Sequence, residues 1–324
     1  MLDCIVIGAG QAGLAVGYYL RKKGLDFVLL DAESGPGAAW RHTWPSLTLF
    51  SNAASSNLPG WPMPHYEGFP PASHVIDYFA RYEQRYELPI RRPVRVDEVT
   101  HDGACFHVYA GEEKLTSRTV VAATGTWSAP FIPYYPGNFG GRQWHSAFYP
   151  GPEAFSGSTV AVVGGANSGA QIAAELLLSG VETTWYTRSS PRWMPDDVDG
   201  RVLFQRNRAR LNAMLRGEPD PGADSNLGDI VMVPPVQRAR DSGLLQATPM
   251  FSSLDEVNTD HLIWCTGFRP ALRPIRGLLA GTSPTVDGLF LVGYGTWTGP
   301  GSATITGVSP FARQTAQAVA NICD

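Results

Sequence analysis

Two glycine-rich turns, 156 positions apart, carry the residues of this chain best suited to hold nucleotides. The turns follow the β-branched runs 5–7 and 160–163, and they consist of Gly8, Gly10 and Gly13 in the first copy and Gly164, Ala166, Ser168 and Gly169 in the second. In a βαβ unit, small residues at this spacing allow a tight strand-to-helix turn, close approach of a pyrophosphate and packing of the helix on the strand. The phosphates then face the helix N-terminus. The repetition predicts two bound dinucleotides.

The two copies differ at the end of their second strand, where a dinucleotide-binding fold contacts the ribose. The run 27–30 ends in Asp31, a carboxylate that can accept hydrogen bonds from ribose hydroxyls, as in FAD or NAD sites. The run 183–186 ends in neutral Thr187, and Arg188 and Ser189 follow it, which suits the 2′-phosphate of NADP. The methyl group of Ala166 stands where backbone should approach phosphate, so the second cofactor is expected to sit displaced or to bind more weakly. A duplicated βαβ pair without ligands is the alternative.

The elements around the turns predict an α/β fold of two nested Rossmann-like domains. Residues 1–153 and 271–324 are expected to form an FAD-binding domain, and residues 154–270 an inserted NAD(P)H-binding domain. Two strand-like runs end in a Thr-Gly pair, at Thr124 and Gly125 and again at Thr266 and Gly267. Small residues there can pass beneath a bound dinucleotide, although an ordinary strand end is the alternative.

Residue patterning also predicts the limits of the other elements. Helices are expected at 12–23, 73–86 and 201–216, and strands at 94–99, 105–109, 119–123 and 289–293. The helix at 201–216 is basic and is expected to be solvated. A C-terminal helix starting at Thr304 or Ile305 should return to the first domain. The irregular segment 34–75 is rich in Trp and Pro and too long for a plain connector, so it is expected to carry function.

Composition excludes several classes of function. With 324 residues and a net charge of −4, the chain has room for two domains and is not suited to nucleic acid or an anionic membrane. It contains no apolar run long enough to span a bilayer. The four cysteines lack CxxC or metal-ligand spacing, so reduced thiols, no metal site and a cytoplasmic location are expected; they are Cys4, Cys105, Cys265 and Cys323.

Residues 139–149 fit the pattern FxGxxxHxxxY through Phe139, Gly141, His145 and Tyr149. Together with the two turns, this segment resembles the identifying motif of flavin-containing monooxygenases, whereas related Baeyer–Villiger enzymes carry a different ending. The likeness extends to the short ArsO-like members found in arsenical-resistance operons, through segments 44–51, 58–64 and 195–201. The resemblance implies that His145 holds the interdomain linker and transfers no proton.

The resemblance also implies roles at three further positions. Asn52 matches the Asn of a Ser-Asn turn that reaches the flavin and stabilises its peroxide adduct; a turn-forming Asn bonded to its own backbone is the alternative. Trp40 matches a position beside the flavin, and filling core volume is the alternative. Gly293 follows the last strand, where many flavoproteins carry Gly-Asp, but here Tyr294 comes next, which leaves contacts to the ribityl chain open.

The family resemblance finally implies a reaction. NADPH, with NADH as an alternative donor, reduces FAD; the reduced flavin reacts with O₂, and a C4a-hydroperoxide transfers oxygen to a sulfur, nitrogen or arsenic atom of a small molecule. One alternative is a reductase or oxidase that passes electrons to another acceptor, although the lack of CxxC argues against the thioredoxin-reductase form. Another is a flavin redox sensor without turnover. The sequence leaves the substrate open, and also the oligomeric state, for which a homodimer is one option.

Overall fold

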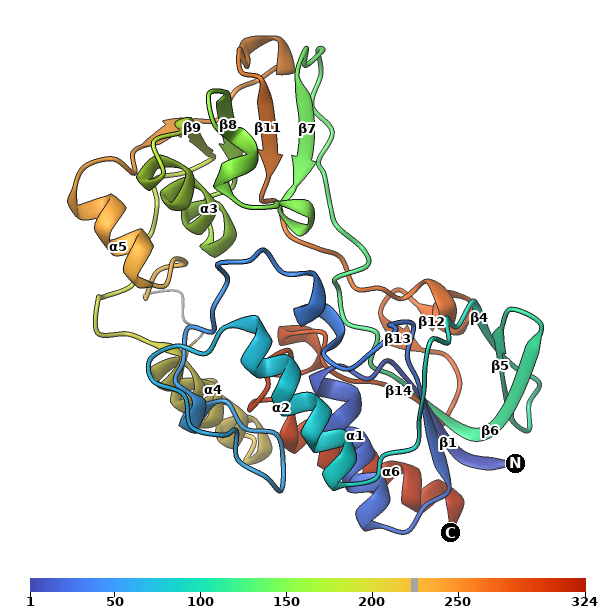
Figure 1. The fold of residues 1–324 in the computed structure, drawn as a ribbon. Coiled ribbons are helices and arrows are strands. Elements are labelled where there is room, and N and C mark those ends of the chain that lie inside the picture. The colour runs from blue at the N-terminus through green and yellow to red at the C-terminus, as the bar shows by residue number, and fades with distance from the viewer. Residues whose placement is uncertain (223–226) are drawn as a thin grey trace.

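The computed structural model describes residues 1–222 and 227–324, whose elements form two α/β units (Figure 1). The first unit is built on a seven-stranded sheet. Its strands, in spatial order, are β3 (Ile90–Arg91), β2 (Phe27–Leu30), β1 (Leu2–Ile7), β6 (Glu113–Ala122), β5 (Phe106–Ala110) and β4 (Glu98–His101), with β14 (Leu289–Leu291) also paired to β6. Strands β3, β2, β1, β6 and β14 pair in parallel, whereas β5 runs antiparallel to both β4 and β6.

The second unit has a five-stranded, all-parallel sheet. Its spatial order is β10 (Ala247–Pro249), β9 (Glu182–Thr187), β8 (Thr159–Val163), β11 (His261–Trp264) and β7 (Arg142–His145). Strand β7 lies in the stretch 1–153 that was expected to belong to the first domain, yet it pairs with β11. We therefore propose that the second domain begins ahead of β7. The predicted α/β fold with two nested dinucleotide-binding units is confirmed.

Successive side chains of the central strands point to opposite faces of the sheet, so a separate hydrophobic core lies on each face of each sheet. In β1, Cys4 and Val6 pack with α1 (Gln11–Lys22), α2 (Ala72–Arg85) and α6 (Ser309–Cys323), whereas Ile5 and Ile7 face the opposite layer. In β8, alternate residues pack against α3 (Asn167–Leu178) and α5 (Pro234–Asp241). Since α6 packs with α1, the predicted return of the C-terminus to the first unit is confirmed.

Short elements complete the described part of the chain. Strands β12 (Leu279–Ala280) and β13 (Ser283–Pro284) form an antiparallel pair. The 3-10 helices are η1 (Ala38–His42), η2 (Ala53–Ser55), η3 (Ser146–Phe148), η4 (Pro152–Phe155), η6 (Leu254–Glu256), η7 (Arg273–Leu278) and η8 (Thr296–Thr298). None of the described helices has the length and apolar character needed to cross a membrane.

Helix α4 (Gly200–Leu215) follows β9 of the second sheet in the chain but lies against the first unit, near α2 (Figure 1). The prediction of a solvated helix is wrong for one of its faces, because Leu211 is buried in the core of the first unit. The Phe204 ring also lies 6.3 Å from the Phe50 ring, and the Gly200 amide donates to the Phe50 carbonyl at 2.8 Å. Helix α4 thus fastens the second unit to the irregular segment 34–75. Residues 223–226, which belong to the predicted loops around it, lie outside the described residues.

Three predicted element limits are wrong, the first being that of β6, which begins at Glu113 rather than at Thr119. No strand forms over residues 94–97, since the Val94 amide donates to the Asp31 carbonyl and β4 begins only at Glu98. Helix α6 begins at Ser309 rather than at residue 304 or 305. The Thr304 hydroxyl bonds the Gly301 carbonyl, a side-chain bond that favours turns over helix.

The turn of each βαβ unit brings backbone onto backbone. A Cβ added at Gly13 would lie 1.9 Å from the Gly8 carbonyl oxygen, and one at Gly169 would lie 2.0 Å from the Gly164 oxygen. Gly8 and Gly164 themselves have φ of +100° and +141°, and a Cβ on either would meet the carbonyl at the end of the neighbouring strand. Glycine at the outer positions is therefore a requirement of the fold itself.

Gly169→Ala should destabilise the protein by about 1–3 kcal/mol or more, because the backbone oxygen of Gly164 cannot rotate away from the new methyl group as a side chain would. Chemical denaturation followed by circular dichroism measures the change. Gly140→Ala is the matched control, since a Cβ there meets nothing within 4 Å. Equal stabilities of the two variants would contradict the prediction.

Candidate functional site

The middle position of each turn differs from the outer two. A Cβ on Gly10 would meet only the Ala38 methyl group, at 3.3 Å, and in the second turn Ala166 occupies this position and is exposed. Gly10 and Ala166 are the N-cap residues of α1 and α3, and neither makes a side-chain capping bond. Amides in the first turn of each helix therefore remain for an anion. At Gly10 a Cβ is restricted by one side chain rather than by backbone, so the middle position is less constrained than the outer two.

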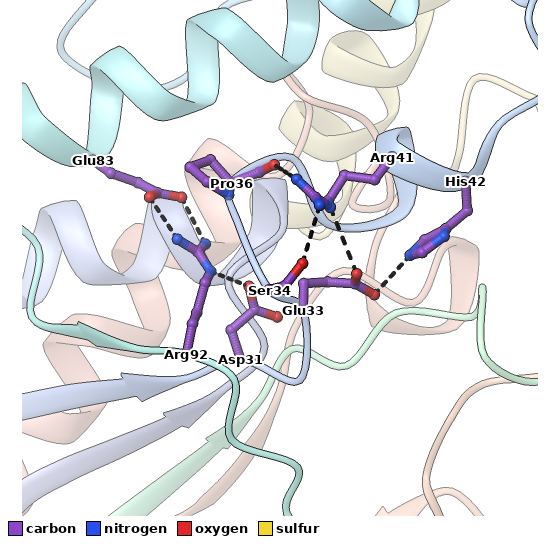
Figure 2. Close-up of polar contacts among 8 residues, drawn as sticks. All are labelled: Asp31, Glu33, Ser34, Pro36, Arg41, His42, Glu83 and Arg92. Carbon is purple, nitrogen blue, oxygen red and sulfur yellow. Dashed lines mark hydrogen bonds and ion pairs between the residues drawn. The ribbon is translucent and has the colours of Figure 1, made fainter.

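Asp31, at the end of β2, lies in a buried ionic cluster (Figure 2). Its Oδ2 accepts from Nε of Arg92 at 2.6 Å, and the two terminal nitrogens of Arg92 donate to Glu83 at 2.7 and 2.8 Å. Oδ1 of Asp31 makes no hydrogen bond with any described residue. The sequence analysis missed Arg92 and Glu83, because they lie 61 and 52 positions from Asp31 in the chain.

Burial and ion pairing act against each other within the cluster. Burial opposes the charge of Arg92, but the hydrogen bonds and charges of Glu83 and Asp31 outweigh it and raise the Arg92 pKa. Burial raises the pKa of Glu83, against the lowering influence of Arg92. A guanidinium that bridges two carboxylates fixes their positions. Asp31 is therefore held rigidly at the sheet edge.

A second set of contacts shapes the loop between β2 and η1 (Figure 2). Arg41 donates to the Pro36 carbonyl at 3.3 Å and to the Ser34 hydroxyl at 3.1 Å, and its Nε lies 3.8 Å from Glu33. His42 contacts the other oxygen of Glu33 at 2.8 Å. This loop positions Trp40, which is partly buried and packs against the core of the first unit. The volume-filling alternative for Trp40 thus has a structural basis.

The residues that follow β9 in the second unit differ in exposure from its last residue. Thr187 is buried, whereas Arg188 and Ser189 are exposed. Within the described part of the chain, Arg188 donates only to the Tyr135 hydroxyl, at 3.4 Å. Ser168 lies in the first turn of α3. A cationic and a hydroxyl group are therefore available at the sheet edge that the glycine turn also reaches.

Asn52 is the N-cap of η2 and is exposed. Its Oδ1 accepts from the Ser55 amide at 3.1 Å, the local bond that the turn-forming alternative predicted. Its Nδ2 group has no partner among the described residues. The side chain therefore caps its own turn and still has two N–H groups to donate.

Thr124, Gly125 and Gly293 gather where β6 and β14 end. The Thr124 hydroxyl bonds the Ala271 carbonyl at 2.8 Å and the Tyr294 hydroxyl at 2.7 Å. A Cβ on Gly293 would lie 2.5 Å from the Ala12 methyl group, so β14 approaches the first turn of α1. Tyr294, which the sequence analysis left without a role, ties these strand ends together. Burial raises its pKa to about 12, so it remains a neutral phenol.

The two crossings between the units run side by side. The Phe131 amide donates to the Gly267 carbonyl at 3.0 Å, and the Arg269 amide donates to the Ala129 carbonyl at 2.8 Å. His145 is buried, accepts the Ala147 amide at Nδ1, and so directs its Nε2 proton to the Gly267 carbonyl at 3.0 Å. Burial lowers the His145 pKa. His145 thus bonds the second crossing, as its expected linker role requires, and its lack of a role in proton transfer stays a prediction.

Cysteines supply no redox pair among the described residues, where all four are free. Asp102, Cys105 and His107 bring their potential ligand atoms within 4.8 Å of one another, which the sequence spacing had not indicated. Oxygens of Asp102 already accept the Ala104 and Cys105 amides and contact His107. These bonds explain the cluster as a hydrogen-bonded turn between β4 and β5.

Comparisons with known proteins agree with this arrangement. Residues 5–286 match the family described as pyridine nucleotide-disulphide oxidoreductase. An uncharacterised oxidoreductase, CzcO of Bacillus subtilis (strain 168), is 30% identical over 340 residues, which cover 95% of this chain and 96% of that protein. Indole-3-pyruvate monooxygenase YUCCA1 of Oryza sativa subsp. japonica is 29% identical over 207 residues, covering 62% of this chain and 51% of that protein.

The solved structure of a flavin-containing monooxygenase from Stenotrophomonas maltophilia is 43% identical, with a TM-score of 0.87 and coverage of 100% of this chain and 99% of that chain. The resemblance to flavin-containing monooxygenases is thereby confirmed, whereas the likeness to ArsO-like members stays a prediction. The chain belongs to the pyridine nucleotide-disulphide oxidoreductase family and is an oxidoreductase with flavin-containing monooxygenases among its structural neighbours.

Proposed function

We propose that this oxidoreductase is an FAD-dependent monooxygenase that uses NADPH and O₂ to oxygenate a small molecule. The observation that carries the proposal is the pair of glycine turns, in which backbone contacts require glycine at the outer positions and no side chain caps the helix that follows. The different strand ends, Asp31 and Thr187–Arg188, favour different dinucleotides in the two units. Similarity to a flavin-containing monooxygenase along the whole chain supports oxygenation as the reaction.

FAD would lie on the first unit, with its pyrophosphate at the N-terminus of α1. The free Oδ1 of Asp31 would accept a ribose hydroxyl while Arg92 holds the other oxygen. Trp40, Gly125 and Gly293 come from segments that end at the same sheet edge. Their placement suits an extended cofactor that crosses the ends of β1, β6 and β14.

NADPH would lie on the second unit, with its pyrophosphate at the N-terminus of α3 beside Ser168. Arg188 and Ser189 would contact the 2′-phosphate. The methyl group of Ala166 limits how closely the backbone approaches the pyrophosphate. NADH lacks the phosphate and is the expected weaker alternative.

When bound, FAD supplies the redox chemistry by accepting hydride from NADPH and activating O₂. For a thioether substrate, the balance is thioether, O₂, NADPH and H⁺ giving sulfoxide, water and NADP⁺. The residues of the chain bind and orient the cofactors and exclude water, and the free amide of Asn52 offers a donor for developing negative charge. A reductase would instead consume NADPH without inserting oxygen.

Asp31→Asn should weaken FAD binding by roughly 5- to 150-fold, because a hydrogen bond to a charged acceptor contributes about 1–3 kcal/mol. Fluorescence titration of the apoprotein with FAD measures the dissociation constant. Glu83→Gln is the matched control, since it also removes a carboxylate partner of Arg92 but not the proposed ribose acceptor. An equal loss in both variants would assign Asp31 to the ionic cluster alone.

Arg188→Ala should raise the KM for NADPH about tenfold or more and leave that for NADH nearly unchanged, because a charge-assisted phosphate contact contributes about 1.5–3 kcal/mol. Steady-state kinetics with each cofactor gives the two ratios. Arg192→Ala is the control, since this nearby exposed arginine already pairs with Asp229 at 3.5 Å. Parallel losses for NADPH and NADH would count against a phosphate contact.

The wild-type enzyme should incorporate one atom of ¹⁸O₂ into a thioether for each NADPH consumed, whereas Asn52→Ala should release hydrogen peroxide instead. Losing one preorganised donor costs about 2.7–4 kcal/mol in comparable sites. Flavin reduction by NADPH, followed by stopped flow, should stay nearly intact. Asn52→Asp keeps the Oδ1 that caps Ser55 but lacks the amide donor, so it should uncouple as the alanine variant does. Full coupling in Asn52→Asp would leave Asn52 with its turn-capping role only.

A further inference from the structure

A cavity of about 470 Å³ lies between part of α4 and the first unit. One wall is the face of α4 that carries Arg201, Phe204, Arg208 and Leu211, which recur at helical spacing. The opposite wall comes from residues 300–310 and from the turn that follows Asn52. None of the glycine-turn residues lines it. Its volume falls in the range of small-molecule sites, about 300–1,000 Å³.

The cavity is positively charged. Arg201 and Arg208 line it, and no Asp or Glu is found among its lining residues. Arg208 makes no ion pair or hydrogen bond within the described part of the chain, and the carboxylate of Asp199 lies 3.9 Å from Arg201. The N-terminus of the 15-residue helix α6, at Ser309 and Pro310, adds its positive end. Both arginines are exposed, so the charge of Arg208 is available to an anionic ligand that enters the cavity.

The remaining walls are apolar or carry hydroxyl and amide groups. Phe204, Leu211, Pro300 and Pro310 are among the lining residues, so a ligand would need an apolar body as well as an anionic group. Planar guanidinium groups match the geometry of a carboxylate with two parallel hydrogen bonds. The chemistry of the walls therefore fits a small carboxylic acid.

The cavity adjoins the turn that Asn52 caps. Ser55, whose amide bonds Asn52, is a lining residue. The Thr306 hydroxyl donates to the Ser55 carbonyl at 2.7 Å and accepts the Asn57 amide at 2.8 Å. These bonds fix the cavity wall to the Asn52 turn. A molecule held here would lie next to the donor proposed for oxygen transfer.

We propose that this cavity binds the carboxylate of the substrate and that Arg208 selects for it, so that the enzyme prefers small amphipathic acids. The inference rests on the proposed monooxygenase function and names its substrate class. The acid's carboxylate is bound by Arg208, with Arg201 at the same face, and its apolar body lies against Phe204.

The probes are 3-(methylthio)propanoate and its uncharged methyl ester, each of which carries the same thioether group. Calorimetric titration of the oxidised holoenzyme without NADPH measures binding alone, and kcat/KM for each probe measures selection during turnover. The wild-type enzyme should bind the acid at least about tenfold more tightly than the ester, since contacts with a charged group are the stronger ones. Arg208→Gln should abolish this preference, and Arg208→Lys should restore part of it.

Arg206→Gln is the matched control, because Arg206 is exposed on the same helix but does not line the cavity, and its acid-to-ester ratio should equal that of the wild type. Equal affinities for acid and ester in the wild-type enzyme would overturn the proposal. An acid-to-ester ratio that stays at the wild-type value in both Arg208→Gln and Arg201→Gln would also overturn the proposal. A preference for binding the acid without oxygenation of either probe would instead contradict the monooxygenase function, so the two failures are distinguishable.

Discussion

Backbone pressed against backbone at two strand ends is the constraint on which the rest of this structure depends. Gly13 and Gly169 meet the carbonyls of Gly8 and Gly164 at distances that no side chain allows. The close packing points the N-termini of α1 and α3 at the carboxyl edges of their sheets. Because neither helix start is capped by a side chain, both present free amides at these edges. The same steric contact therefore shapes the fold and prepares two anion-binding positions.

Charge then distinguishes the two otherwise equivalent edges. At the first, Arg92 sits between Asp31 and Glu83, which leaves one carboxylate oxygen of a buried, fixed Asp31 unused. At the second, Thr187 is neutral and buried and Arg188 is exposed. A ribose needs acceptors, whereas a 2′-phosphate needs a cation. The difference arises from single residues on a repeated backbone.

Two sets of contacts connect the units besides the chain itself. One is the pair of hydrogen-bonded crossings, to which His145 adds a bond from the second sheet. The other is α4, which reaches back from the second unit and buries Leu211 in the first. Together they place the cavity beside the Asn52 turn, where the segments 54–57, 201–211 and 300–310 meet.

The sequence by itself determined the features that local backbone chemistry dictates. Glycine spacing, strand patterning and the residues at strand ends predicted both βαβ units, and the FxGxxxHxxxY motif predicted the linker role of His145. Tertiary structure alone decided which distant partners meet. Arg92 beside Asp31, β7 beside β11 and α4 on the first unit all join segments far apart in the chain, and sequence spacing carries no information on such contacts. Asn52 shows the same limit at short range, since its residue type fits both a turn cap and a ligand donor, and the fold decides where its free amide points.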